Sequence, residues 1–152
     1  MITQNTALFT IFGATGDLAH RKLYPSLFRL YKKGFIKDNF AVIGTARRDW
    51  TDEYFREVVL DSIKDLTEDK EDALSFAAHF YYIAHNVNDS EQYIKLKVLS
   101  ESLDAKYSLS GNRIFYLAMS PEFFGIIAEK LKEQKLITAD GFNRLIIEKP
   151  FG

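Results

Sequence analysis

One stretch constrains the fold more than any other part of the chain: residues 7–19 read Ala-Leu-Phe-Thr-Ile-Phe-Gly-Ala-Thr-Gly-Asp-Leu-Ala. An apolar, partly β-branched run ends at Gly13 and Gly16, and a helical pattern follows at once. Strand, glycine turn and helix in this order are typical of a dinucleotide-phosphate cradle, because glycine lets backbone N–H groups approach the anion and the helix N-terminus is positive. The spacing G-x-x-G-x-x-A is a variant of the commoner G-x-G-x-x-G, and the absence of a following G-K-[ST] excludes a P-loop.

The rest of the chain alternates short apolar runs with helical patterns. The strands we expect are Leu8–Phe12, Phe40–Gly44, Phe80–Ala84, Arg113–Met119 and Leu145–Glu148. Between them, apolar residues recur three and four positions apart, as in the stripe Tyr93, Leu96, Leu99 and Leu103. This alternation predicts an α/β fold, a Rossmann-like doubly wound parallel sheet with helices on both faces, as one domain over residues 1–152.

The first crossover contains a proline. Tyr24-Pro25 lies inside the helical pattern Leu18–Lys33, and proline breaks or restarts a helix. We therefore expect one short helical turn over Asp17–Lys22 and a longer helix from Pro25 to Gly34.

Two later segments give further local expectations. Residues 66–78 are acidic and are expected to form a solvated helix or loop. Ser120-Pro121-Glu122 follows a strand directly and predicts a helix start, with serine as the cap and proline in the first turn. This places the loop Ala118–Ser120 at the carboxyl edge of the sheet, where open α/β folds bind ligands; a well-capped helix without a ligand role explains the same residues.

Composition excludes several classes of protein. The 152 residues carry a net charge of −1, so no basic field indicates binding to nucleic acid or to an anionic membrane. Cysteine is absent, which excludes disulfides and thiolate chemistry and suits a reducing compartment. No apolar run reaches the roughly 18 residues of a membrane span, and the N-terminus lacks the basic start of a secretory signal. We expect a cytoplasmic protein without membrane or nucleic-acid partners.

Arg47 and Arg48 follow the second expected strand, where a dinucleotide fold places the adenosine ribose. An NAD site usually offers Asp or Glu to the 2′-hydroxyl, whereas arginine accommodates a 2′-phosphate. No acid stands there before Asp49. The pair favours NADP, with NAD still possible; a solvated basic turn is the alternative reading.

Other candidates for chemistry are isolated. Lys149-Pro150 follows the fifth expected strand, and Lys22 lies one turn after the glycines; each lysine could enter the cleft or simply face solvent. The three histidines have no acidic partner at a telling spacing and receive no proton-transfer role. Tyr93 and Lys97 match the Y-x-x-x-K pair of short-chain dehydrogenases, but they lie between the third and fourth strands, so Tyr93 is interpreted as core.

Four motifs in order resemble glucose-6-phosphate dehydrogenases of the bacterial type, and together they cover essentially the whole chain. They are Gly13–Ala19, Arg21–Pro25, Asn112–Leu117 and Glu148–Gly152. The resemblance implies oxidation of glucose 6-phosphate at C1 to 6-phosphogluconolactone with reduction of NADP or NAD, the entry step of the oxidative pentose phosphate pathway.

The resemblance also assigns roles to residues. The residues expected at the coenzyme are Gly13, Ala14, Thr15, Gly16, Asp17, Leu18 and Ala19 for the pyrophosphate, Arg47 and Arg48 for the 2′-phosphate, Asn86 and Val87 with the rest of the segment 84–87 for the adenine, and Lys149. Lys22 and Lys149 would border the nicotinamide and the sugar phosphate, with Lys149–Pro150 as a cis bond. Relatives often have Asp where Asn86 stands. No metal site is expected.

The family's catalytic histidine and much of its sugar-phosphate site belong to a larger second domain, which this chain does not include. We therefore expect a coenzyme-binding portion without its catalytic base, inactive or nearly so alone, whose dimer or higher contacts lie in that second domain. Two alternatives stay open: a free-standing, non-catalytic NADP-binding module, and a sugar-nucleotide epimerase or reductase domain. The position of Tyr93 and Lys97 argues against the second.

Overall fold

Five strands form a single parallel sheet in the computed structural model, which describes residues 6–147. The strands are β1 (Ala7–Phe12), β2 (Phe40–Ala46), β3 (Phe80–Ala84), β4 (Arg113–Leu117) and β5 (Asn143–Ile147). Their order in the sheet is β3-β2-β1-β4-β5, and every pairing is parallel. The chain direction across the sheet reverses between β1 and β4, so the crevice at their carboxyl ends is the place where such folds bind ligands.

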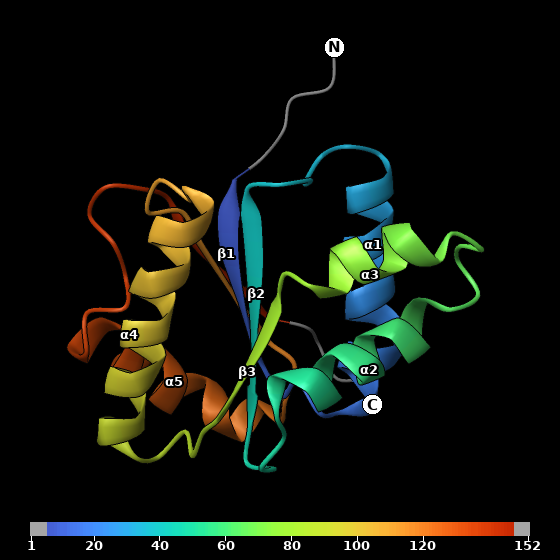
Figure 1. Cartoon of the computed structure of the whole chain (residues 1–152). Helices are drawn as coiled ribbons and strands as arrows, with labels where there is room; N and C mark the ends of the chain where they lie inside the picture. The colour runs from blue at the N-terminus through green and yellow to red at the C-terminus, as the bar shows by residue number, and fades with distance from the viewer. Residues whose placement is uncertain (1–5, 148–152) are drawn as a thin grey trace.

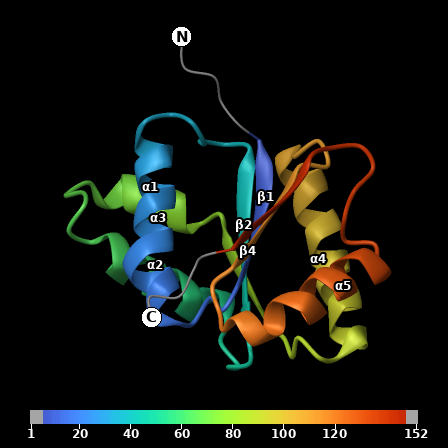
Figure 2. The ribbon, with the colours of Figure 1, turned by 180° about the vertical axis from the view of Figure 1, so that it is seen from behind.

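Helices cover both faces of this sheet, which confirms the expected Rossmann-like fold. The helical elements are η1 (Ala19–Leu23), α1 (Tyr24–Lys32), α2 (Asp52–Ile63), α3 (Lys70–Ala77), α4 (Ser90–Tyr107), η2 (Pro121–Phe123) and α5 (Phe124–Glu133). Figures 1 and 2 show α1, α2 and α3 on one face and α4 and α5 on the other. Among residues 6–147, none of the helices combines the length and apolarity that crossing a membrane requires.

The alternation of side chains along β1 divides the core in two. Ile11 belongs to a cluster with the aromatic residues Phe28 and Phe55 of α1 and α2, whereas Leu8 and Phe12 pack with α4 and α5. The apolar stripe of α4 behaves as expected: Tyr93, Leu96 and Leu103 are buried, and Leu99 is partly buried against the same cluster. Because both faces of β1 and β2 are covered, these strands read as nearly continuous apolar runs.

The expected break at Pro25 is wrong, because the helix runs without interruption from Asp17 to Lys32. Its first part is a π turn, η1, in which the Tyr24 N–H donates to the Ala19 carbonyl, one residue further back than in an α-helix. Pro25 has no N–H to continue this pattern with the His20 carbonyl. The Ser62 hydroxyl of α2 donates to that carbonyl instead, at 2.5 Å, and so satisfies the group that the proline leaves open.

Other boundaries also differ from expectation. β2 extends two residues further, to Ala46, while β4 ends at Leu117; the Ala118 N–H still donates to the Phe12 carbonyl at 2.8 Å, and the Ala118 carbonyl lies against Gly13. The acidic segment 66–78 was expected to form either a solvated helix or a loop, and it contains helix α3 over Lys70–Ala77. This helix is not solvated on all sides, because Phe76 and Ala77 are buried.

The helix start after β4 is built differently from the expected cap. The Ser120 side chain makes no capping hydrogen bond, and the 3₁₀ turn η2 precedes α5. Pro121 does stand in the first turn, as expected, because its missing N–H needs no partner there.

β5 forms one margin of the sheet, next to β4. It starts at Asn143, two residues earlier than expected, and its apolar residues Leu145, Ile146 and Ile147 are exposed. The expected Glu148 end of this strand, Lys149 and the cis Lys149–Pro150 bond lie outside the described residues.

Candidate functional site

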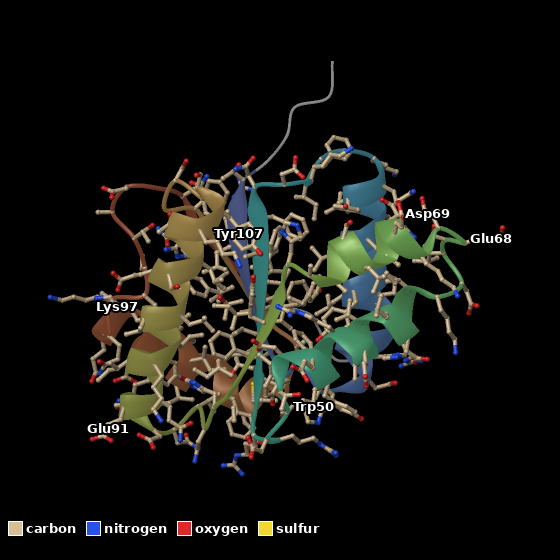
Figure 3. All side chains as sticks on the ribbon, viewed as in Figure 1. Trp50, Glu68, Asp69, Glu91, Lys97 and Tyr107 are labelled. Carbon is tan, nitrogen blue, oxygen red and sulfur yellow. The ribbon has the colours of Figure 1, made fainter. Side chains whose placement is uncertain are left out.

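A pocket of about 280 Å³ opens at the carboxyl edge of the sheet, the edge at which Trp50 lies in Figure 3. Its walls come from the loops that follow β1, β2, β3 and β4. The lining residues are Gly13, Thr15, Thr45, Ala46, Arg47, Arg48, His85, Val87, Met119 and Phe123. A second pocket of about 280 Å³ shares Arg47 and His85 with the first and adds Ala84, Asn86 and Gln92.

The glycine turn is held by β2 and by the loop after β4. The N–H groups of Gly13 and Ala14 both donate to the Thr45 carbonyl, at 2.9 and 3.2 Å, and the Gly16 N–H donates to the Gly13 carbonyl. Gly13 has φ +92°, and a Cβ there would lie 2.4 Å from the Ala118 carbonyl oxygen, so this position requires glycine.

Thr15 forms the tip of this turn and differs from its neighbours. Within residues 6–147, its N–H has no hydrogen-bond partner, and Thr15 lines the pocket. The helix that starts at Asp17 directs its positive N-terminal end toward the same turn. A free N–H beside a helix N-terminus suits an anionic ligand.

Arg47 and Arg48 project from the turn that follows β2. Both are exposed, and no ion pair within the described part of the chain engages either guanidinium. The Tyr82 hydroxyl secures the turn by donating to the Arg48 carbonyl at 2.5 Å, with the Ala46 carbonyl also within reach at 3.2 Å. Burial, with the Asp49 charge nearby, raises the pKa of Tyr82 to about 12, so this hydroxyl remains a donor at neutral pH. Two exposed guanidiniums without an ion-pair partner among the described residues suit a phosphate.

His85 follows β3 and lies at both pockets. Its side chain is 3% exposed, and Phe12 and Tyr93 pack against its ring edge to face, at 5.9 and 4.3 Å between ring centres. Burial lowers its pKa to about 4, so the imidazole is neutral at pH 7. Neither ring nitrogen has a hydrogen-bond partner among the described residues. A neutral, orphaned imidazole beside a pocket is a feature that sequence spacing did not reveal.

The structure brings together only part of the predicted site. Gly13, Thr15, Arg47, Arg48 and Val87 line the first pocket, and Asn86 lines the second. The remaining predicted residues of the turn and helix line neither pocket: Ala14, Gly16, Asp17, Leu18, Ala19 and Lys22. Ala14 and Ala19 are buried, while Lys22 is exposed on η1. Lys149 is not among the described residues.

Thr45, Ala46, Met119 and Phe123 line the pocket without having been predicted as site residues, and His85 was expected there only as a member of the segment 84–87 along the adenine. Met119 lies in the loop 118–120 that the strand–helix junction indicated. Phe123 carried no such signal, because an apolar lining residue looks like a core residue in a sequence.

Tyr93 is buried, as its interpretation as core requires, and its hydroxyl donates to the Val87 carbonyl at 2.8 Å. This hydrogen bond therefore links Tyr93 of α4 to the loop that contains Val87. This arrangement removes the main residue that an epimerase or reductase site would use.

Comparison with known proteins gives a consistent result. Residues 10–152 match the family model described as "Glucose-6-phosphate dehydrogenase, NAD binding domain". The chain is 57% identical over 145 residues to the glucose-6-phosphate 1-dehydrogenase of Streptococcus pneumoniae serotype 4, and 51% identical over 152 residues to that of Leuconostoc mesenteroides. These matches cover 95% and 100% of the chain, which spans 29% and 31% of the length of the two relatives.

The fold agrees with solved structures. A structure described as glucose-6-phosphate dehydrogenase in complex with its substrate glucose-6-phosphate superposes with a TM-score of 0.87 at 35% identity. The match covers 100% of this chain and 32% of that one. A glucose-6-phosphate 1-dehydrogenase from Mycobacterium avium gives a TM-score of 0.75 at 29% identity, over 97% of this chain and 30% of that one.

Proposed function

The chain belongs to the glucose-6-phosphate dehydrogenase family, and on that premise we propose that it is the coenzyme-binding domain, residues 1–152, of an enzyme that oxidises glucose 6-phosphate to 6-phosphogluconolactone with NADP as the acceptor. A nicotinamide dinucleotide is the coenzyme class of this domain. The choice of NADP rests on one observation: Arg47 and Arg48 stand at the pocket without an ion-pair partner among the described residues.

The donors present fit such a coenzyme. The Thr15 N–H and the helix N-terminus behind it offer partial positive charge to the pyrophosphate. The guanidiniums of Arg47 and Arg48 would bind the 2′-phosphate of the adenosine ribose. The loop of His85, Asn86 and Val87 would lie along the adenine. When bound, the nicotinamide ring accepts a hydride from the sugar carbon.

The remaining roles concern the sugar. Lys22 and Lys149 would border the nicotinamide and the glucose 6-phosphate, and their positive charge suits that phosphate. Abstraction of the proton from the C1 hydroxyl needs a base with a pKa suited to neutral pH. We place that base, and the contacts between subunits, in the part of the family's length that this chain does not span.

Calorimetric titration of the chain with NADP and with NAD tests the coenzyme assignment. We expect tighter binding of NADP, and we expect Arg47→Ala to weaken NADP binding about tenfold, because a charge-assisted contact is worth about 1.5–3 kcal/mol. The same variant should bind NAD with unchanged affinity. Arg29→Ala is the matched control, since Arg29 is an exposed arginine on α1 outside both pockets. Equal affinity of the unmodified chain for the two coenzymes would contradict the proposal.

A further inference from the structure

Tyr24 connects the helix after the glycine turn back to the turn itself. Its ring is fully buried and packs edge to face on Phe55 and Phe80, with ring centres 5.7 and 5.8 Å apart. Its hydroxyl donates to the Ala14 carbonyl at 2.6 Å. Burial raises the pKa of Tyr24 far above its usual range, so the hydroxyl is a donor at every relevant pH.

The Ala14 carbonyl determines where the next N–H points. A trans peptide is planar, and its C=O and N–H groups point in opposite directions. No cis bond occurs among the described residues, so a carbonyl drawn inward by Tyr24 directs the Thr15 N–H outward, to the side of the pocket that Thr15 lines. The preceding N–H groups of Gly13 and Ala14 are already bonded to the Thr45 carbonyl.

The π turn sets the position of Tyr24. It places one extra residue in the turn that separates Gly16 from Tyr24, and the Tyr24 N–H reaches back to the Ala19 carbonyl. α2 fastens this turn twice: the Ser62 hydroxyl donates to the His20 carbonyl, and Asp61 contacts the His20 ring at 3.0 Å. These contacts therefore fix the position of the Tyr24 side chain relative to the glycine turn.

We propose that the Tyr24 hydroxyl is a positioning group for the coenzyme pyrophosphate: it locks the Ala14–Thr15 peptide with the Thr15 N–H facing the pocket. The inference rests on the proposed coenzyme-binding function. Without the hydroxyl, the buried Ala14 carbonyl has no donor, and rotation of the peptide toward water relieves this cost. That rotation turns the Thr15 N–H away from the anion.

Tyr24→Phe keeps the packed ring and removes only the donor. NADP and adenosine 2′-monophosphate are the two probes, because the second carries the 2′-phosphate but no pyrophosphate. Calorimetry, with competition for the weaker ligand, should show NADP bound about tenfold more weakly by the variant, because the redirected Thr15 N–H no longer donates to the pyrophosphate. Affinity for adenosine 2′-monophosphate should change by less than about twofold.

Tyr81→Phe is the matched control. It removes a buried hydroxyl that bonds to Tyr107 at 2.6 Å, outside both pockets, and both ligands should bind it as they bind the unmodified chain. Ser62→Ala is a second variant, expected to weaken NADP binding in the same selective manner but less. Equal weakening of both ligands by Tyr24→Phe, or unchanged NADP binding, overturns the inference. An unmodified chain that binds neither ligand overturns the proposed function itself.

Discussion

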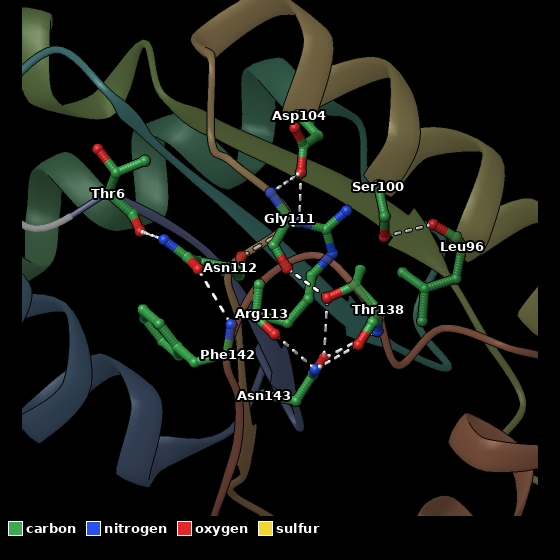
Figure 4. Close-up of polar contacts among 11 residues, drawn as sticks. Thr6, Leu96, Ser100, Asp104, Gly111, Asn112, Arg113, Thr138, Phe142 and Asn143 are labelled. Carbon is green, nitrogen blue, oxygen red and sulfur yellow. Dashed lines mark hydrogen bonds and ion pairs between the residues drawn. The ribbon is translucent and has the colours of Figure 1, made fainter.

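The two edges of the sheet use polar groups in opposite ways. At the carboxyl edge, the Thr15 N–H, the two guanidiniums and the His85 ring nitrogens lack hydrogen-bond and ion-pair partners among the described residues. At the amino edge, side chains bond to backbone groups of segments far apart in the sequence, as Asn112 does to Thr6 and Thr138 does to Gly111 (Figure 4). One edge therefore keeps its donors for a ligand, whereas the other uses them to close the fold.

The amino edge centres on Asp104 of α4. Its carboxylate accepts the Gly111 N–H at 3.0 Å and Nη1 of Arg113 at 2.6 Å (Figure 4). The Thr138 hydroxyl donates to the Gly111 carbonyl, and the Asn143 side chain accepts the Thr138 N–H at 3.0 Å. This network, which joins Asp104, Gly111, Arg113, Thr138 and Asn143, ties α4 to the starts of β4 and β5.

Cavity size alone would favour the amino edge. A cavity of about 420 Å³ lies beside this network, larger than the 280 Å³ pocket at the carboxyl edge. Arg113, which lines it, has an Nε without a partner, but its Nη1 is already committed to Asp104. Uncommitted donors around a glycine turn identify a ligand site better than volume does.

Replacement of Gly13 should produce the largest effect and tests the carboxyl edge. Gly13→Ala forces a side chain into a positive φ and to within 2.4 Å of the Ala118 carbonyl oxygen. The strained backbone alone costs about 1–3 kcal/mol, so we expect lower stability in urea and a loss of NADP affinity of more than about 100-fold.

The control for this change is Gly125→Ala. Nothing lies within 4 Å of a Cβ at Gly125, which is exposed in α5. Alanine there should stabilise the chain by up to about 1 kcal/mol, as in other helices, with NADP affinity unchanged. If Gly13→Ala bound NADP with normal affinity, the glycine turn would not be part of the binding site.

Replacement of Asp104 tests the amino edge. Asp104→Ala leaves the Gly111 N–H without its acceptor and the buried Arg113 guanidinium without its counter-ion, with the Asn112 carbonyl at 3.1 Å as the acceptor that Nη1 keeps, and should lower the free energy of unfolding by about 2–3 kcal/mol. Coenzyme affinity of the folded variant should stay within about twofold of normal. Glu101→Ala, at an exposed residue beside the same cavity, should change stability by less than about 0.5 kcal/mol. A large loss of NADP affinity in Asp104→Ala would break the separation of the two edges.

The histidines that flank β3 provide the smallest and sharpest test. His79 lies at the amino edge, where Nδ1 bonds to the Phe40 carbonyl at 2.7 Å; burial lowers its pKa. His85, at the carboxyl edge, has no such partner, and its pKa falls to about 4. The unfolded chain, with a pKa near 6.5, binds more protons in this range, so stability falls as the pH drops from 7 toward 4.

Urea unfolding at pH 7 and pH 5 measures this difference. We expect the unmodified chain to lose about 1–2 kcal/mol between these values through His85, a window above the titration of ordinary carboxylates. His85→Phe, which can keep the aromatic packing, should flatten the pH dependence more than His79→Phe does. Equal flattening by the two variants would show that the edges do not differ in this respect.

The sequence predicted the parts of the molecule that depend on local pattern. Strand, glycine turn and helix at residues 7–19, the parallel sheet, and the position of Arg47 and Arg48 beside the turn all follow from residue order and spacing. The loop 118–120 was also indicated, because a strand ends immediately before it.

The features that the sequence did not predict depend on contacts between distant segments. Pro25 predicts a helix break unless another segment supplies a donor, and Ser62 supplies it from α2. The orphaned His85 results from burial between Phe12 and Tyr93, which no spacing shows. Tyr24 reads as a core residue, and only its hydroxyl's contact with Ala14 reveals a second role.

The strand pairings described above also bear on the order in which the chain folds. β1 pairs with β2 through Ala7 and Phe40, but with β4 through Leu8 and Arg113, a far longer loop. Loop closure costs more entropy as the loop lengthens, and distant pairings form late. We therefore expect β1, β2 and β3 to assemble as the folding nucleus, and with them the glycine turn, the arginine turn and His85. Most of the pocket at the carboxyl edge would then exist before β4 and β5 join the sheet.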